Sequence, residues 1–500
     1  MKVLLVNAVS YYVKQKATIP LGLLSLATHL TQAGHTVELF DRAVDGGGMS
    51  KRLRGFKPDI VGVSSLGIMS FDDAIKVSIT AKKAGLPVVW GGHIPTLIPD
   101  IVLKTGTVDY VILGDGEYPF AALLNALSEN TPVDVIEGLA YIQGEETVVN
   151  HPRTDTDLAQ LPVIDFSFVD PEKYFIRNMD RERMLHVYSS KGCIGKCTYC
   201  YCPAHSGGRW RARPTENFIR ELRYLKEVHR IDGFYFVDDL FAPNRERVAQ
   251  VCDALLDSGL DLIWSCDMRT DGCTEEILQR MYEAGCRWIF FGIESGSDKR
   301  QKTIRKKLDT AEIETVLALC ARIGIWTTTS FVIGFPDETV EELKQTLELV
   351  RRVKSDVKLA ALYGPMPESE MYKELLENQR LTPPKSYKEW KTLAVIDELG
   401  NNYSQIPAKH LKVISSYFFY AVFRTKKTDS AQKVASHVWL RRLFGNAFDI
   451  VRRGNLKSLY ILVLSAKEFS LILYYALCFP KIRNKYGLGS SNSNKSTPTV

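Results

Sequence analysis

Four of the chain's ten cysteines stand within ten residues, in the stretch SKGCIGKCTYCYC at 190–202. Cys193, Cys197 and Cys200 have the spacing C-x3-C-x2-C. Thiolates bind zinc or iron–sulfur clusters, and structural sites of both kinds usually have four protein ligands. This spacing supplies only three cysteine ligands. It therefore favours a [4Fe–4S] cluster with one open iron, because a catalytic metal centre keeps an open coordination position.

A zinc site is the structural alternative, with Cys202 or His205 as the fourth ligand. Cys202 stands two positions beyond Cys200, so in an extended segment its side chain points the other way. It would be strained as a ligand of the same centre. The sequence by itself leaves both kinds of site open.

The composition is that of an ordinary globular protein, with 45% of the 500 residues hydrophobic and 24% charged. This length predicts two to four domains. The chain begins with MKVLLVNAVS, which has the pattern of a buried strand and not of a charged leader with a cleavage site. We therefore expect a cytoplasmic protein. Clustered cysteines in such a protein are more often metal or redox groups than disulfides.

Residues 1–140 alternate short apolar runs with helix-length segments. Near-continuous apolar runs, each followed by a helical pattern, indicate parallel strands in a sheet with helices on both faces. We therefore predict an α/β, doubly wound, Rossmann-like domain with strands at 2–7, 35–41, 59–65, 87–92 and 109–114. Such sheets bind ligands at the carboxyl ends of their strands.

Small and glycine-rich turns follow three of these strands, at 64–66, 91–93 and 114–117. Such glycines either let the backbone approach a ligand or only make tight turns between strand and helix. Three of these turns at one edge of a sheet favour a ligand. A nicotinamide cofactor is disfavoured, because VNAVSYYVKQ after the first strand lacks G-x-G-x-x-G.

Residues 141–183 lose this periodicity and are rich in Pro and Asp, which predicts an ordered linker. From 184 to 390, six further apolar runs alternate with five helical patterns. Strands are expected at 183–190, 233–239, 262–269, 288–295, 326–335 and 356–362. We predict a partial (β/α)6 barrel whose functional residues lie at the carboxyl ends of its strands.

The cysteines follow the first barrel strand, and C-x3-C-x2-C in that position resembles the radical S-adenosylmethionine (SAM) enzymes. Tyr199 stands at the aromatic position that this family commonly has before its third cysteine. The resemblance implies that Cys193, Cys197 and Cys200 hold a [4Fe–4S] cluster whose open iron binds the amino and carboxylate groups of SAM. Reduction of the cluster then cleaves SAM to a 5′-deoxyadenosyl radical, which requires an electron donor such as flavodoxin or ferredoxin.

The resemblance also assigns SAM contacts at the ends of later strands. Asp238 and Asp239 end the second barrel strand, where the family binds the SAM amino group. Glu294 and Ser295 suit the ribose or methionyl group, and Ile333, in SFVIGFP, lies in the segment that packs against adenine. A strand-terminal acidic residue is often only a helix cap. The order of these motifs after the cysteines therefore carries the assignment.

A doubly wound domain ahead of this barrel resembles the cobalamin-binding subclass of radical SAM enzymes, over residues 1 to 390. The resemblance implies a set of cobalamin-binding residues, which are Pro20, Leu21, Ser64, Leu66, Gly91, Gly92, His93, Gly114 and Glu117. The motif D-x-H-x-x-G, which supplies a histidine to cobalt in other cobalamin domains, is absent. We therefore expect cobalamin without histidine ligation, and His93 near the nucleotide tail of the cofactor.

The C-terminal region, 391–488, has helical patterns and carries the positive charge of the chain. From Lys409 onward there are 16 Lys and Arg and 3 Asp and Glu, a balance of +13 compared with +6 for the whole chain. Lys467 and Glu468 interrupt its most apolar stretch, which is costly inside lipid, so we predict no membrane span. The region is either a helical cap on the barrel or a surface that touches the inner face of the membrane. Residues 489–500 are predicted to be disordered.

The leading hypothesis is a cobalamin-dependent radical SAM methyltransferase that acts at an unactivated carbon of a small-molecule or lipid-like substrate. In the mechanism that the resemblance implies, one SAM methylates cobalamin and a second yields the radical that abstracts a substrate hydrogen. Ring formation or another rearrangement with the same cofactors is the alternative. A non-catalytic iron–sulfur or cobalamin-binding module is the third hypothesis. Nucleic acid is disfavoured as a partner, because the chain has no recognisable RNA-binding motif.

Overall fold

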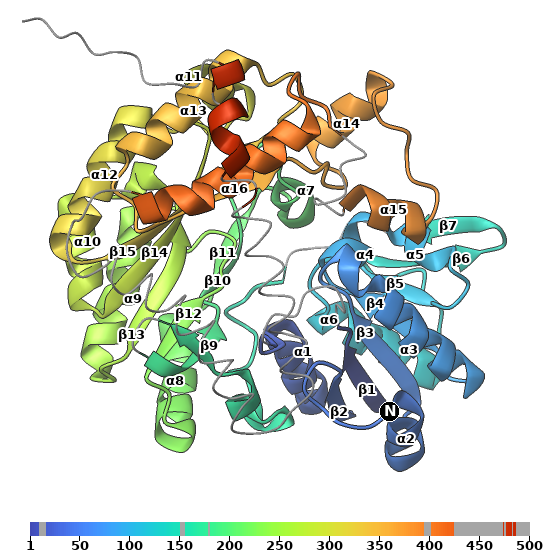
Figure 1. Cartoon of the computed structure of the whole chain (residues 1–500). Helices are drawn as coiled ribbons and strands as arrows, with labels where there is room; N and C mark the ends of the chain where they lie inside the picture. Colours follow the sequence, from blue (N-terminus) through green and yellow to red (C-terminus); the bar gives the residue numbers. More distant parts are fainter. Residues whose placement is uncertain are drawn as a thin grey trace, which may run out of the picture. The chain divides into compact units, whose positions relative to one another are not determined.

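The structure is a computed structural model of the chain and describes residues 1–9, 17–150, 156–178, 181–394, 402–424, 474, 477–482 and 484–486. The chain divides into two compact units, each of which gathers segments that are distant in sequence. The first comprises Met1–Asp267, Glu283–Cys286 and Pro365–Val395, and the second comprises Met268–Tyr282, Arg287–Gly364 and the residues from Ile396 onward. Figure 1 labels their helices and strands.

The first unit contains a seven-stranded sheet in the order β2-β1-β3-β4-β5-β6-β7. The neighbours among the first five strands are parallel, which confirms the predicted doubly wound domain. Strand order reverses between β1 and β3, the kind of position where such sheets bind ligands. The five strands are β1 (Lys2–Asn7), β2 (Thr36–Asp41), β3 (Ile60–Ser64), β4 (Val88–Gly91) and β5 (Tyr110–Ile112).

An antiparallel hairpin, β6 (Leu139–Gln143) and β7 (Glu146–Val149), extends this sheet. These two strands were not predicted, because they fall mostly in the segment interpreted as a linker. Gly144, with a φ of 67°, makes the turn between them. A hairpin at the edge of a sheet needs only one buried face, so its apolar run is short and does not stand out in the sequence.

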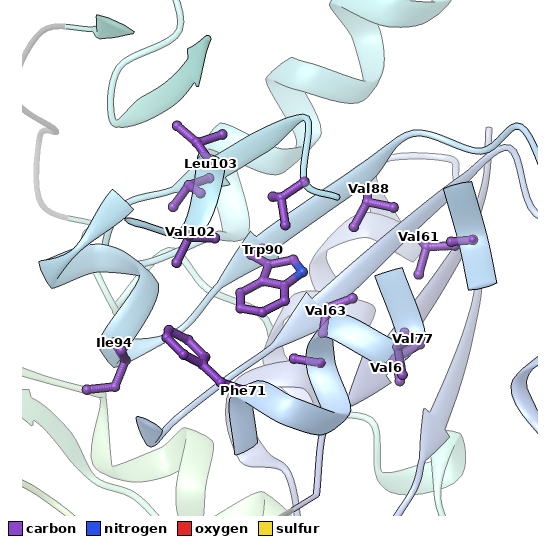
Figure 2. Packing of buried hydrophobic residues seen from close by; sticks show 14 of the residues in the cluster. Val6, Val61, Val63, Phe71, Val77, Val88, Trp90, Ile94, Val102 and Leu103 are labelled. Atoms are coloured by element: carbon purple, nitrogen blue, oxygen red, sulfur yellow. The ribbon is translucent and has the colours of Figure 1, made fainter. Parts of the chain in front are cut away.

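Helices cover both faces of this sheet. On one face Val6 and Trp90 belong to the core cluster shown in Figure 2. On the other face a Cβ on Gly62 would lie 2.8 Å from the Leu5 side chain and 2.9 Å from the Phe120 ring, so only glycine lets the helix pack here. The helices are α1 (Leu21–Gln32) and α6 (Glu117–Glu129) on the Phe120 face, and α2 (Met49–Phe56), α3 (Phe71–Lys83), α4 (His93–Leu97) and α5 (Pro99–Leu103) on the Trp90 face.

Two later helices, α14 (Glu370–Glu377) and α15 (Tyr387–Ala394), complete the same core. Tyr372 and Trp390 are buried in the same hydrophobic cluster as Phe71 and Trp90, with their ring centroids 5.4 Å apart. The Tyr387 ring lies 6.4 Å from the ring of Phe71. After the barrel strands the chain therefore returns to the domain with which it began.

The segment predicted as an ordered linker is held against the first sheet by a buried hydrogen bond. It contains two short 3-10 helices, η2 (Phe166–Phe168) and η3 (Pro171–Tyr174). The Tyr174 hydroxyl donates to Asp41 Oδ2 at the end of β2, at 2.9 Å. Since both groups are buried, this hydrogen bond holds the segment against the first sheet.

The second sheet has the order β16-β15-β14-β13-β12-β9-β8. Its six barrel strands correspond to the six predicted apolar runs, and β8 (Ile176–Asn178) adds an antiparallel edge strand that was not predicted. The barrel strands are β9 (Arg181–Val187), β12 (Gly233–Phe236), β13 (Ile263–Met268), β14 (Cys286–Glu294), β15 (Trp326–Ile333) and β16 (Val357–Leu362). The helices between them are α8 (Thr215–His229), α9 (Arg245–Ser258), α10 (Glu275–Glu283), α11 (Asp298–Thr303), α12 (Thr310–Ile323) and α13 (Val340–Arg352). This is the predicted partial barrel.

The C-terminal region is described for α16 (Ala408–Arg424) and a few later residues. The Ser415 hydroxyl donates to the Ala360 carbonyl of β16 at 2.8 Å, so α16 packs against this strand within the second unit. Most of the basic, aromatic-rich segment lies outside the described residues, and its role stays a prediction. In the ranges given above, no helix is both long and apolar enough to cross a membrane.

Candidate active site

The cysteine loop lies between β10 (Ser190–Gly192) and α7 (Cys202–Ser206), directly after the first barrel strand. β10 pairs with β11 (Trp210–Ala212) in an antiparallel ribbon that holds both ends of the loop. Gly192 has a φ of 87°, and a Cβ there would overlap the carbonyl oxygen of Arg209. Only glycine therefore fits where the chain enters the loop.

The three predicted cluster ligands are partly exposed thiols, and backbone N–H groups of the loop donate to two of them. Gly195 N lies 3.3 Å from Cys193 Sγ, and Cys202 N lies 3.4 Å from Cys200 Sγ. A Cβ on Gly195 would lie 3.2 Å from Cys193 Sγ, so the glycine leaves room beside the sulfur. Tyr199 is half-buried in the same loop. Accessible sulfurs with N–H donors fit the ligands of a [4Fe–4S] cluster.

The two residues considered as a fourth zinc ligand contact other protein groups. Cys202 is buried with its Sγ 3.8 Å from Ser206 Oγ, and a hydrogen bond with Cys193 together with burial raises the pKa of its thiol. His205 packs its ring on that of His93, with centroids 4.5 Å apart. Within the described ranges, no group of three or more Cys, His, Asp and Glu side chains could hold one metal ion.

The predicted aspartate pair consists of one buried and one exposed side chain. Asp238 accepts from Ser189 N at 2.8 Å and from the hydroxyls of Ser189 and Ser190 at 2.6 and 2.9 Å. Burial nevertheless raises the pKa of Asp238 to about 7. Asp239 is exposed, and one of its oxygens accepts from Gly192 N at 2.9 Å. Asp239 is thus available to a ligand's ammonium group, whereas Asp238 fastens β10 to the end of β12.

The other predicted SAM contacts lie in the second unit. Glu294 ends β14 with a φ of 69°, a strained conformation for this residue type, and its Oε1 lies 3.2 Å from Lys306 Nζ. A Cβ on Gly292 would lie 2.6 Å from Glu294 Oε1, so the glycine makes room for this ion pair. Ser295 is fully buried beside Glu294, and Ile333 ends β15 with its side chain fully buried. The structure brings the first two together at the end of one strand.

Several of the predicted cobalamin-binding residues gather at the carboxyl edge of the first sheet. Ser64 ends β3 in register with Gly91 at the end of β4. Gly92 has a φ of 109°, and a Cβ there would lie 2.8 Å from the Ser65 carbonyl oxygen, so this turn requires glycine. Leu66 is 56% exposed. A large apolar side chain exposed at a ligand-binding edge fits contact with a large, partly apolar cofactor.

The remaining predicted residues lie at two neighbouring helix starts. Pro20 and Leu21 are buried and support the start of α1, whereas Gly22 is exposed and a Cβ there would meet nothing within 4 Å. Gly114 follows β5 with a φ of 74°, and its N–H donates to Thr96 Oγ1 at 2.8 Å. The open space at Gly22 and the exposed edge residues fit cobalamin on this side of the domain.

His93, the first residue of α4, contacts aromatic residues that follow the cysteine loop. Its Nδ1 lies 3.4 Å from the Tyr201 hydroxyl, and its ring packs on His205 as described above. Burial lowers the pKa of His93, partly offset by the charge of Asp239. The ring is therefore a neutral imidazole at pH 7, lying between the edge of the first sheet and the cysteine loop.

Glu117, predicted as a cobalamin contact, is buried in a group of four charged side chains that we call the charge cluster: Asp115, Glu117, Lys191 and Arg211. Lys191 Nζ lies 3.0 Å from Asp115 Oδ1 and 3.4 Å from Glu117 Oε1, and Arg211 Nη1 lies 2.5 Å from Asp115 Oδ2. Ser25 Oγ donates to Glu117 Oε1 at 2.6 Å. Burial alone would lower the pKa of Lys191, but the two carboxylates raise it. The charge cluster ties the turn after β5 to the ribbon that holds the cysteines.

Three polar side chains of the first barrel strands were not predicted as site residues: His186 of β9, Tyr235 of β12 and Asp267 of β13. The Tyr235 hydroxyl donates to Asp267 Oδ1, and the rings of His186 and Tyr235 are 5.8 Å apart. A signal for them was present in the sequence. Each is a polar residue with an apolar residue on either side in the sequence.

Two family profiles match the chain and together span more than half of its 500 residues. The Radical SAM superfamily profile matches residues 187–350, and the B12 binding domain profile matches residues 14–124. The first match begins at the end of β9 and contains the cysteine loop. The second covers most of the parallel part of the first sheet. Both lie where the sequence motifs predicted them.

Among curated proteins, the chain is 28% identical over 385 residues to an uncharacterized methyltransferase of Pyrococcus horikoshii, covering 76% of this chain and 82% of that protein. It is 24% identical to the cytidylyl-2-hydroxyethylphosphonate methyltransferase of Streptomyces wedmorensis, covering 77% and 83%. It is 23% identical to the anaerobic magnesium-protoporphyrin IX monomethyl ester cyclase of Rubrivivax gelatinosus, covering 70% and 65%. Among solved structures, the radical SAM methyltransferase TsrM of Kitasatospora setae has a TM-score of 0.69 at 19% identity, covering 84% and 88%. This likeness shows a shared fold.

Proposed function

Because the chain belongs to the radical SAM enzymes with a B12 binding domain, whose cofactors are a [4Fe–4S] cluster, SAM and cobalamin, we propose that it methylates an unactivated carbon of a small-molecule or lipid-like substrate. When bound, these groups supply a carbon radical generated from SAM and a methyl group carried by cobalamin. The two methyltransferase relatives support methyl transfer. The cyclase relative supports ring formation as the competing activity.

The observation that carries the proposal is that the predicted cobalamin edge contacts the cysteine loop's supporting elements within one compact unit. His93 after β4 contacts Tyr201 and His205, and Asp115 after β5 pairs with Lys191. A methyl carrier and a radical source must act on the same substrate atom. Their binding loops must therefore meet, and positioning of this kind contributes much of the rate.

The chain's own residues hold and orient these groups. Cys193, Cys197 and Cys200 would bind the cluster through their thiolates, with the backbone N–H groups described above donating to the sulfurs. The exposed carboxylate of Asp239 would accept the ammonium group of SAM. Glu294 is the expected contact of the ribose or methionyl group, held in place by its ion pair.

The direct test is an anaerobic incubation of the reconstituted enzyme with methyl-labelled SAM, a reductant such as reduced flavodoxin, and fractionated cell extracts. We expect one fraction to yield both a labelled product and 5′-deoxyadenosine. Stimulated 5′-deoxyadenosine formation without a labelled product would reject methyl transfer and favour ring formation or rearrangement. Absence of 5′-deoxyadenosine in every fraction would reject the radical reaction.

The cluster ligands are tested by an absorbance spectrum of the reconstituted protein. Cys197→Ala should lose the iron–sulfur bands that dithionite bleaches, because two sulfurs cannot hold the cluster. Cys202→Ala is the matched control and should keep the bands, since the Cys202 thiol is buried against Ser206. Loss of the bands in both variants would favour a site with four cysteine ligands.

We infer contact with an anionic membrane surface from the C-terminal charge balance of +13 beyond Lys409. Each cation near such a surface contributes on the order of 1 kcal/mol, so a few suffice to bring the enzyme to lipid. The full-length protein should sediment with anionic vesicles at low salt and be released at high salt. If it stays in the supernatant at low salt, the region is better explained as a solvated helical cap, and the lipid-like substrate loses its support.

A further inference from the structure

A polar face on the first three barrel strands is not explained by the motifs assigned above. His186 of β9 is in register with Tyr235 of β12, and Tyr235 is in register with Ser265 of β13. Side chains in register on neighbouring strands lie on the same side of a sheet, and Asp267, two residues after Ser265, shares that side. We call His186, Tyr235, Ser265 and Asp267 the polar face.

The opposite side of the same strands is apolar and covered by helices. Phe236 and Trp264 are at most 1% exposed, and Phe218 of α8 packs on Phe236 with ring centroids 5.7 Å apart. On the polar face, by contrast, three of the four side chains are only partly buried. The polar face therefore lies on the side of the sheet that these helices do not cover, and three of its four residues stand next to the carboxyl ends of their strands, where enzymes of barrel architecture place their functional residues.

Two buried atoms of the polar face have no hydrogen-bond partner in the part of the chain that the structure describes. They are His186 Nδ1 and Ser265 Oγ, and Ser265 is only 2% exposed. Buried polar atoms are nearly always paired, because leaving one unpaired costs free energy. The neighbouring bond from the Tyr235 hydroxyl uses only Oδ1 of Asp267. The polar face thus has unused hydrogen-bonding capacity on the side of the sheet that the helices do not cover.

The charge of the polar face indicates which kind of group fits it. Burial lowers the pKa of His186 to about 4, so its imidazole is neutral at pH 7. Burial raises the pKa of Asp267 to about 6, although the hydrogen bond from Tyr235 acts to lower it. Most of this carboxyl is therefore ionised at pH 7. Among the described residues, no Lys or Arg forms an ion pair with Asp267. A carboxylate without a neighbouring cation attracts hydrogen-bond donors and repels anions.

We propose that the polar face binds the substrate through a hydroxyl or amino group, which donates to Asp267 while Ser265 and His186 make further hydrogen bonds to it. The site selects neutral or cationic polar groups and rejects carboxylates and phosphates. His186 lies seven residues before Cys193, so the bound group is held on the strand that leads into the cysteine loop. The inference rests on the proposed function only in assigning the bound group to the substrate of the radical reaction.

The test measures binding of three ring compounds that differ in one substituent: cyclohexanol, cyclohexylamine and cyclohexanecarboxylate. Equilibrium dialysis is done with the holoenzyme loaded with cluster, cobalamin and SAM. The alcohol and the amine should bind, and the carboxylate should bind at least about tenfold more weakly. Asp267→Asn and Ser265→Ala should each weaken alcohol binding about tenfold, the size expected for a lost hydrogen bond to a charged or buried group. Tyr235→Phe should also weaken it, whereas the matched Tyr224→Phe, at an exposed position of α8, should not.

Three results would overturn the proposal: no binding of any probe, equal binding of the carboxylate and the alcohol, or unchanged alcohol binding in both Asp267→Asn and Ser265→Ala. SAM also carries hydroxyl groups, so its affinity is measured in the same variants. A tenfold loss of SAM affinity would assign the polar face to SAM and reject the substrate assignment. Failure of the proposed function gives a different result. If the probes bind as predicted but no labelled methyl product forms, methyl transfer is rejected and the assignment of the polar face as a binding site still holds.

Discussion

Replacing Lys191 with methionine tests whether the charge cluster holds the cysteine loop to the B12 binding domain. Methionine has a similar length and keeps the apolar contacts of the lysine stem while removing its charge. Asp115 would keep its ion pair with Arg211 at 2.5 Å. Glu117 would lose the ammonium group 3.4 Å away and keep the Ser25 hydroxyl at 2.6 Å. The variant therefore leaves one buried carboxylate without a cation.

The expected cost follows from the burial of the two partners. Removing one partner of a buried ion pair costs about 3–5 kcal/mol, because the other charge stays buried and unpaired. The Lys191 side chain is 24% exposed, and Glu117 keeps a hydroxyl donor at the favourable N-terminal end of α6. We therefore expect a loss of about 2–3 kcal/mol in local stability. This corresponds to opening that is about 30–150 times more frequent.

Hydrogen–deuterium exchange, measured by mass spectrometry on peptides from 186–212 and 110–129, reports this local opening. Lys104→Met is the matched control, because Lys104 forms an exposed i,i+4 pair with Asp100 and such pairs contribute only about 0.3–0.5 kcal/mol. In a second variant, Glu117→Gln added to Lys191→Met removes the stranded charge and should restore at least half of the lost protection. Acceleration of less than about threefold in Lys191→Met, or no more than in the control, would refute the reasoning.

Two further predictions concern single positions. Gly92→Ala should abolish cobalamin binding, because the new Cβ would lie 2.8 Å from the Ser65 carbonyl oxygen. The control Gly106→Ala has a φ of 69° and open space around it, so it should lower the free energy of unfolding by about 1–2 kcal/mol and keep the cobalamin absorbance. Equal cobalamin content in the two variants would contradict this. Burial raises the pKa of Glu338 from 4.5 to about 7, so the folded protein binds more protons than the unfolded chain in this window and its stability falls as pH rises through it. Glu338→Gln keeps an acceptor for the Gly334 N–H. In denaturant unfolding, the free energy of unfolding of this variant should rise by about 3 kcal/mol relative to that of wild type as the pH increases from about 4.5 to about 7.5. If the two proteins show parallel pH profiles, this carboxyl does not titrate as proposed.

The barrel strands were predictable because a strand covered by helices must be apolar. Phe234 and Phe236 of β12 are both fully buried, and such runs are visible in the sequence. Strands β6, β7 and β8 were not predicted, since an edge hairpin buries only part of its residues and resembles a polar loop. Tyr141 and Ile142, for example, are partly or largely exposed in β6. The strands could thus be predicted from the sequence where they are fully buried, and they could not be predicted at the sheet edges.

The cysteine loop was predictable because its ligands are local in sequence, whereas the groups that hold it come from far away. Lys191 and Glu117 are 74 residues apart, and no local sequence pattern in either segment predicts that they form an ion pair. Asp238 and Asp239 are adjacent in the loop directly after β12, where the strand's alternation of side chains no longer decides which of them faces inward. Which of them turns inward depends on the position of Ser189, a partner 49 residues away. Local motifs identify the chemistry, and long-range contacts decide which residue performs it.

The return of α14 and α15 to the first sheet has a consequence for the order in which the protein becomes complete. Tyr372 and Trp390 fill the core beside Phe71, so this core cannot close until the ribosome has added about 250 residues beyond the B12 binding domain. At about 5–20 residues per second this takes about 10–50 s. The domain that is synthesised first is therefore among the last parts to be completed. During that interval its apolar surface is available to chaperones on the nascent chain.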